Sequence, residues 1–177
     1  VDILRALGAK VEYIPNLYMK VDPRPADGWQ VSYADSQRLR ASYYLLGALL
    51  GRRNEAEVYL PGGCAIGARP MDIHLSSLEQ MGATIEIKNG YVHADIKGRL
   101  KGAHITFHSA SVGATCNILM AATLAEGETV IENAAKEPEI GDLIDLLTAM
   151  GAKIEGRDSS KLTIQGVDKL HGAQHKV

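Results

Sequence analysis

Three stretches of the sequence repeat one pattern, a helical segment that ends at a glycine and is followed by a strand. They are LRALGAKVEYI (4–14), LEQMGATIEIK (78–88) and LTAMGAKIEGR (147–157). In each, apolar residues at helical spacing precede a glycine suited to the left-handed position after a helix, and alternating residues follow. These glycines recur after 74 and 69 residues, long for a solenoid repeat but sufficient for two helices and several strands. The sequence therefore predicts copies of one α/β unit.

The second half of the predicted unit is repeated as well. Apolar helical segments at 41–51 and 113–125 are each followed by strand-like residues, at 57–63 and 129–135. A third copy continues in strand-like residues at 159–170. Two units and part of a third predict pseudo-threefold packing, with sheets outside and helices buried between them. Because the first helical segment starts without a methionine or a cap, we expect the chain to be part of a longer protein.

The composition agrees with a globular domain and disfavours several functions. Of 177 residues, 46% are hydrophobic, enough for a core of ordinary size. The 19 basic and 21 acidic residues are interspersed and the net charge is -2, so no broad field favours nucleic acid or a membrane. No apolar run reaches the roughly 18–20 residues of a membrane span, and no leader is visible, so a cytoplasmic location is expected. Neither metal-ligand spacings nor the glycine motifs of nucleotide folds occur, and no metal or cofactor is expected.

The stretch PGGCAIGARPMDIH (61–74) places Cys64 in a glycine-rich loop with Arg69 close behind it. A cysteine that serves only packing more often lies on the apolar face of an ordered element. A neighbouring guanidinium lowers the pKa of a thiol toward neutrality, which suits a proton donor or nucleophile. Cys64 is therefore a candidate catalytic residue, with an incidental loop cysteine as the alternative. Cys116, inside the second apolar helix, is predicted to be a core residue.

Two arginines and one aspartate are candidate ligand contacts near this loop. Arg40 lies just before the apolar segment 41–51, and Arg69 follows the cysteine. A guanidinium binds phosphate through paired hydrogen bonds, while a solvated surface role is the alternative for each arginine. Asp72 is expected to cap the helix at 72–81, or to accept hydrogen bonds from a ligand.

The stretch SASVGAT (109–115) is a turn of small residues that leads into a helix. Ser109, Ser111 and the amides at the helix start can bind phosphate oxygens, and an ordinary serine N-cap is the alternative. KEPEIGD (136–142) occupies the place in the second repeat that the cysteine loop has in the first. Among the histidines, His74 is expected near a site. The others considered are expected to be surface residues on strands: His93, His104 and His108.

Several of these stretches together resemble the UDP-N-acetylglucosamine 1-carboxyvinyltransferases, the enolpyruvyl transferases of bacterial peptidoglycan synthesis. They are LPGGCAIGARPMDIHLSSLEQMGATIE, LRASYYLLGALL, GRLKGAHI, SVGAT and AATLAEGETVIENAAKEPEI. The cysteine loop with its following GARP distinguishes this family from the shikimate-pathway enolpyruvyl transferases. The resemblance implies an inside-out α/β barrel fold of two domains, each built from three βαβαββ repeats. Residues 1–177 would form one incomplete domain that carries the cysteine loop, and the second domain would lie outside the chain.

The resemblance also implies an activity, the transfer of the enolpyruvyl group of phosphoenolpyruvate to the 3-hydroxyl of UDP-N-acetylglucosamine with release of phosphate. Cys64 would be the general acid and the residue attacked by fosfomycin, and Arg40 and Arg69 would contact substrate anions. The implied contacts to the uridine end are Pro70, Met71, Asp72 and Ile73. The implied contacts to the diphosphate are Ser109, Ala110, Ser111 and Val112. The resemblance implies neither a metal nor a cofactor.

The chain departs from the family pattern at two points. Ser109 stands where some relatives have lysine, so a charge is missing there. The family's lysine–asparagine pair would precede Val1, and the general base is expected in the absent domain, so we expect residues 1–177 alone to be inactive. A binding module without catalysis and an enolpyruvyl transferase acting on shikimate phosphate are the alternatives.

Overall fold

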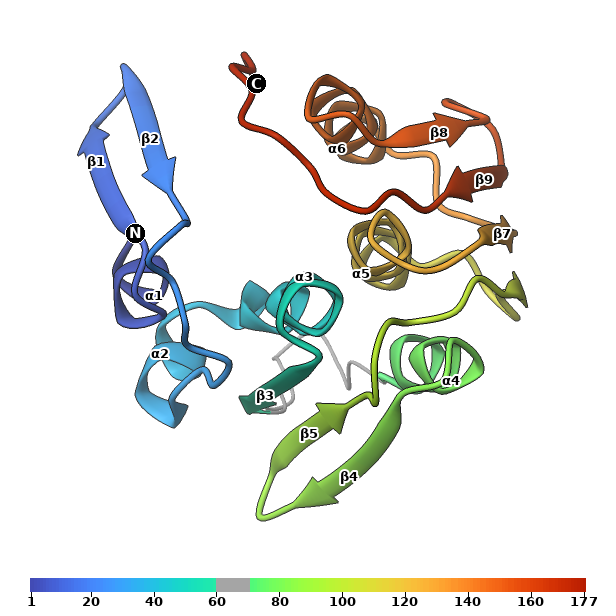
Figure 1. Cartoon of the computed structure of the whole chain (residues 1–177), viewed down its shortest axis with the longest axis horizontal. Helices are drawn as coiled ribbons and strands as arrows, with labels where there is room; N and C mark the ends of the chain where they lie inside the picture. The colour runs from blue at the N-terminus through green and yellow to red at the C-terminus, as the bar shows by residue number, and fades with distance from the viewer. Residues whose placement is uncertain (60–70) are drawn as a thin grey trace.

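Three helix-and-hairpin units follow one another in the computed structural model, which describes residues 1–59 and 71–177 (Figure 1). The first unit contains α1 (Asp2–Ala6), β1 (Lys10–Ile14), β2 (Tyr18–Asp22), α2 (Tyr33–Arg38), the 3-10 helix η1 (Arg40–Tyr44), α3 (Leu45–Arg53) and β3 (Glu55–Tyr59). The second contains α4 (Asp72–Gln80), β4 (Thr84–Lys88), β5 (Tyr91–Asp95), β6 (His104–Thr106), α5 (Val112–Ala122) and β7 (Glu128–Glu132). The third contains α6 (Pro138–Ala149), β8 (Lys153–Glu155) and β9 (Lys161–Gln165).

The repeated glycines end equivalent helices in the same way. Gly8, Gly82 and Gly151 have φ values of +92°, +95° and +99°, in the left-handed region. After α1, α4 and α6, the amide of the residue following the glycine bonds to the carbonyl five residues earlier, at 2.9, 3.0 and 2.9 Å. This pattern is the Schellman motif, which turns the chain directly into the first strand of each hairpin. The predicted helix–glycine–strand repeat is therefore confirmed.

Each larger sheet is assembled across the boundary between two units. β3 pairs with β5 to give the order β3-β5-β4, and β7 pairs with β9 to give β6-β7-β9-β8. In the second sheet, β6 pairs in parallel with β7. The first sheet has only a parallel bridge, between Gln30 and Glu57, at the equivalent place beside β3. The final strand of one unit thus pairs with the second strand of the hairpin in the next unit. In the described part of the chain, β1 and β2 pair only with each other.

Helices form the centre of the molecule and the sheets lie around them. α5 contacts α3, α4 and α6, and nine of its residues are buried. Figure 1 shows α5 among these helices with the hairpins toward the periphery. The predicted packing of buried helices inside outer sheets is thus present, although residues 1–59 and 71–177 do not form a closed barrel. No helix in these two ranges is long and apolar enough to cross a membrane.

Two local predictions differ from the structure, and one helix was not predicted. The apolar segment 41–51 begins as the 3-10 helix η1, and its regular helix α3 starts only at Leu45. The strand expected at 159–170 is limited to β9. Helix α2 was not predicted, although the hydroxyl of Ser32 accepts a hydrogen bond from the amide of Asp35 at 3.1 Å. A serine N-cap of this kind is a recognisable helix-start signal.

The closest helix packing occurs where α3 crosses α5. A methyl group on Gly47 would overlap the backbone carbonyl of Asn117. Four residues further along α3, a methyl group on Gly51 would lie 3.4 Å from the carbonyl oxygen of Ala121, an ordinary contact distance. The two glycines therefore form a matched pair, one required by close packing and one not.

We expect Gly47→Ala to destabilise the full-length protein by about 1–3 kcal/mol, because α3 must move away from α5. Gly51→Ala should be neutral or stabilise it by up to about 1 kcal/mol, because alanine favours the helix. Urea unfolding of both variants and the parent measures the difference. Equal midpoints for the two variants would contradict this account of the helix crossing.

Candidate functional site

The cysteine loop joins two described elements, the end of β3 and the start of α4. Cys64, Arg69 and Pro70 lie outside the described residues, so their predicted roles stay predictions. The equivalent connection in the next unit runs from β7 to α6, and Pro138 occupies the first position of that helix. The predicted correspondence between the two connections is therefore confirmed. Arg40 is the first residue of η1, at the beginning of the buried helical segment as expected.

The starts of α4 and α5 are held together by a direct side-chain contact. His108 Nε2 lies 2.9 Å from Asp72 Oδ2, and this contact joins two segments that were predicted separately to bind a ligand. The hydrogen bond from His108 holds the pKa of Asp72 below its ordinary value. Helix α4 has no side-chain cap, so the interpretation of Asp72 as an N-cap is wrong. His108 lies after β6 rather than on a strand, which also corrects its prediction.

The residues around Asp72 present different groups to solvent. The side chains of Met71 and Ile73 are buried in the core, with exposed fractions of 7% and 8%. Any ligand contact from these two residues would therefore involve backbone atoms or require the core to open. Asp72 is half-exposed and can reach a ligand with its carboxylate.

The turn before α5 is a regular capped helix start. Ser111 Oγ accepts a hydrogen bond from the amide of Ala114 at 3.3 Å, so the serine N-cap interpretation is confirmed. Ser109 and Ala110 are exposed, whereas Val112 is half-buried. The first amides of a helix have no intrahelical acceptor and favour an anion. The turn can therefore offer backbone donors and the exposed Ser109 hydroxyl to a phosphate group.

A buried network of hydrogen bonds in the core connects α4 and α5 with α3 and η1. The side-chain nitrogen of Asn117, Nδ2, donates to His74 Nδ1 at 2.8 Å and to the backbone carbonyl of Tyr43 at 3.1 Å. The Asn117 oxygen accepts from the amide of Gly47 at 2.8 Å. His74 is 4% exposed, and burial lowers its pKa to about 4, so the ring is neutral at pH 7. With Nδ1 as the acceptor, the proton of the neutral ring is assigned to Nε2.

The second cysteine and the possible metal ligands of the described residues show no reactive site. Cys116 is buried, and burial raises its pKa to about 11, which confirms the prediction that it is a core residue. A thiol with a raised pKa has little thiolate at neutral pH. Outside residues 60–70, no three histidine, cysteine or carboxylate side chains lie close enough to hold a metal ion.

The fold is that of the enolpyruvyl transferases. The enolpyruvyl transferase NikO from Streptomyces tendae superimposes with a TM-score of 0.77 over 96% of this chain and 40% of its own, at 24% sequence identity. The profile of the EPSP synthase family, 3-phosphoshikimate 1-carboxyvinyltransferase, matches residues 1–177. The chain therefore belongs to the EPSP synthase family.

Within this family, the curated relatives carry the name that the sequence resemblance indicated. The UDP-N-acetylglucosamine 1-carboxyvinyltransferase of Shewanella woodyi is 53% identical over 176 residues, which cover 99% of this chain and 42% of the relative. The enzyme of the same name from Paramagnetospirillum magneticum is 62% identical over 141 residues, covering 80% of this chain and 33% of the relative. The resemblance is confirmed, and the chain spans less than half the length of these relatives.

The neutral, buried His74 predicts a specific response to acid. Its pKa in the folded protein is about 4, below the unfolded value near 6.5, so protons bind preferentially to the unfolded state between these values. Stability present at pH 7 should therefore be lost as the pH falls, by about 2 kcal/mol at pH 5 from this group alone. His74→Gln should show a shallower decline in the free energy of unfolding of the full-length protein.

The matched control is His104→Gln, because His104 is exposed on β6. This control variant should keep the parent dependence on pH. Urea unfolding at pH 7 and pH 5 measures all three proteins, and a parent-like decline in His74→Gln would refute the assignment.

Proposed function

We propose that the protein containing this chain transfers the enolpyruvyl group of phosphoenolpyruvate to the 3-hydroxyl of UDP-N-acetylglucosamine, releasing phosphate. The main support is the 53% identity to a UDP-N-acetylglucosamine 1-carboxyvinyltransferase over 99% of the chain. The family profile is named after the shikimate enzyme, but the relatives at 53% and 62% identity carry the nucleotide-sugar name. On this proposal the protein acts in the cytoplasm, in the synthesis of peptidoglycan.

The proposed reaction has an addition step and an elimination step. Cys64 protonates the methylene carbon of phosphoenolpyruvate, and the sugar hydroxyl gives its proton to a general base as it adds to the neighbouring carbon to form a tetrahedral ketal. Loss of a proton from the new methyl group, with departure of phosphate, restores the double bond. A proton donor on a closing loop suits the first step. Arg40 and Arg69 would stabilise the substrate anions, and the general base would come from outside residues 1–177.

The described geometry supports the proposed place of the nucleotide sugar. The start of α4 and the turn 109–112 lie together through the contact between Asp72 and His108. On this proposal, residues 70–73 contact the uridine end and residues 109–112 contact the diphosphate. Cys116 is buried, so Cys64 is the thiol proposed for chemistry.

We expect fosfomycin, an epoxide phosphonate that resembles phosphoenolpyruvate, to alkylate Cys64 and to spare Cys116 in the full-length protein. Cys116 is buried and its raised pKa leaves it unreactive, whereas the thiol on the loop is proposed to be reactive. Peptide mass spectrometry after incubation with the inhibitor locates the adduct. Cys116→Ser should retain labelling and Cys64→Ser should lose it.

Two results would contradict the proposed function. One is an adduct on Cys116 with Cys64 unmodified. The other is release of phosphate from phosphoenolpyruvate with shikimate 3-phosphate but not with UDP-N-acetylglucosamine as the acceptor.

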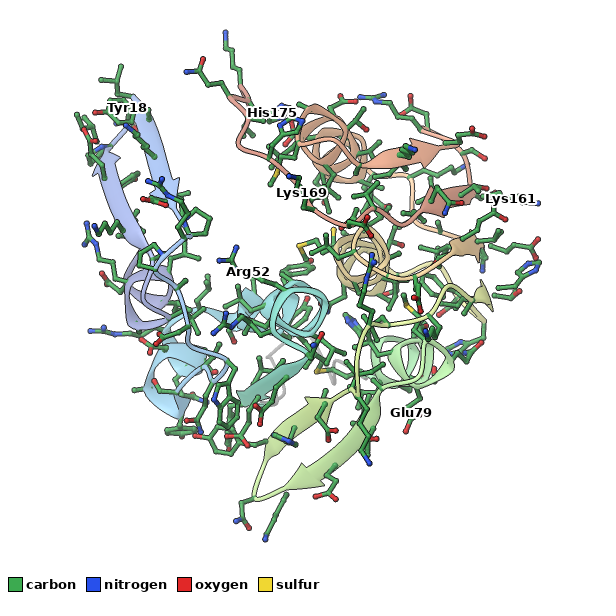
Figure 2. All side chains as sticks on the ribbon, in the orientation of Figure 1. Tyr18, Arg52, Glu79, Lys161, Lys169 and His175 are labelled. Atoms are coloured by element: carbon green, nitrogen blue, oxygen red, sulfur yellow. The ribbon has the colours of Figure 1, made fainter. Side chains whose placement is uncertain are left out.

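We also propose that residues 1–177 form most of one inside-out α/β barrel domain, and that a strand from outside this range pairs with β2. In the other two hairpins the second strand is covered by the last strand of the preceding unit, β5 by β3 and β9 by β7. Large apolar side chains are exposed on or next to the first hairpin: Tyr13, Ile14, Leu17, Tyr18, Met19 and Val21. Figure 2 shows Tyr18 at the end of this hairpin, apart from the helical core.

Amide hydrogen exchange of the full-length protein tests this domain proposal. The amides of β2 should be protected to the same degree as those of β5 and β9, because a covering strand supplies their acceptors. The outward-facing amides of β1 should exchange as those of β4 and β8 do, since these are edge strands. Equally fast exchange of the outward-facing amides in β1 and β2 would rule out the proposed pairing.

A further inference from the structure

The contact between His108 and Asp72 has features that a purely structural ion pair does not require. Both side chains are largely open to solvent, with exposed fractions of 68% and 56%. Exposed pairs of this kind contribute little to folding stability. The pair nevertheless lies at the meeting point of the two segments proposed to bind the nucleotide sugar, one at the start of α4 and one before α5.

The turn before α5 has no permanent positive charge of its own. Between Lys101 and Lys136 the sequence contains neither lysine nor arginine. The imidazoles of His104 and His108 are the only side chains in this interval that can become cationic. His104 lies 3.2 Å from Glu132 on the neighbouring strand β7, whereas His108 immediately precedes Ser109.

We propose that His108 is a substrate-binding residue that contacts the diphosphate of the nucleotide sugar as an imidazolium ion and that Asp72 orients its ring. This inference rests on the proposed function and assigns a residue to the same site. With Nε2 directed to the carboxylate, Nδ1 is left to donate to a phosphate oxygen when the ring is protonated. The proposed positive charge of His108 lies one residue before Ser109. The turn 109–112 has no basic side chain of its own.

The surroundings of His108 leave Asp72 as its charged partner among the residues with described side chains. Asp72 is contributed by α4, the same helix that carries the buried, neutral His74. On β7, Glu132 accepts a hydrogen bond from the Thr106 hydroxyl and pairs with His104 and Lys161. Asn133, which follows β7, donates to the carbonyl of Phe107. On this proposal the affinity falls as the pH rises, because deprotonation of the imidazole removes the donor at Nδ1.

Binding of UDP-N-acetylglucosamine to the full-length protein, measured by calorimetry at pH 6 and pH 8, tests the inference. The parent should bind more tightly at pH 6 than at pH 8, because on this proposal the protonated ring supplies the donor to the diphosphate. His108→Gln should weaken binding at pH 6 by roughly tenfold and remove the dependence on pH. His108→Lys, which stays charged, should bind at pH 8 as tightly as the parent does at pH 6.

His104→Gln is the matched control, because it removes an equally exposed histidine that also faces a carboxylate. It should reproduce the parent affinities at both pH values. Parent-like binding by His108→Gln would overturn the role of His108 while leaving the proposed function intact. A parent protein that does not bind UDP-N-acetylglucosamine at either pH would instead reject the proposed function, and with it this inference.

Discussion

The crossing of α3 and α5 at Gly47 and Asn117 is the contact on which the relative position of three helices depends. Gly47 has no side chain to hold the helices apart. The side-chain amide of Asn117 accepts a hydrogen bond from the Gly47 backbone and donates to Tyr43 and His74. Buried polar groups are costly unless they are paired, so an arrangement that pairs the Asn117 side chain at both its oxygen and its nitrogen is favoured. Through His74 the same network includes α4. Three helices from two repeated units are thereby held in one relative position.

The candidate site depends on that position. Asp72 begins α4 and His108 lies in the turn that enters α5, so their contact requires the two helix starts to be held at a constant separation. The rigid part lies in the core, and the exposed part consists of a turn, a carboxylate and an imidazole. The exposed residues of such a site can contact a ligand, while the packing of the core keeps them in position.

The local features of this chain and its layered packing could be predicted from its sequence, but the pairing of particular strands and side chains could not. Gly8, Gly82 and Gly151 indicate the helix ends because only glycine adopts the left-handed region without strain. Pairing of β3 with β5 joins different units, and a periodic pattern does not specify which strands become neighbours. The contact of Asp72 with His108 joins residues that are 36 positions apart. The serine cap of α2, Ser32, is a local signal of the same kind.

The two connections between a final strand and the next helix differ in length, although the elements on either side of them correspond. After β7 the connection is short and fixed: the amide of Ala134 bonds to Ser160, and the amide of Ala135 bonds to the Thr115 hydroxyl on α5. Both alanines are buried, so this copy of the connection serves packing. After β3 the chain instead has the longer, glycine-rich stretch with Cys64 before α4 begins. Because the flanking strands and helices are equivalent, lengthening one connection can add reactive groups without altering the unit that supports them.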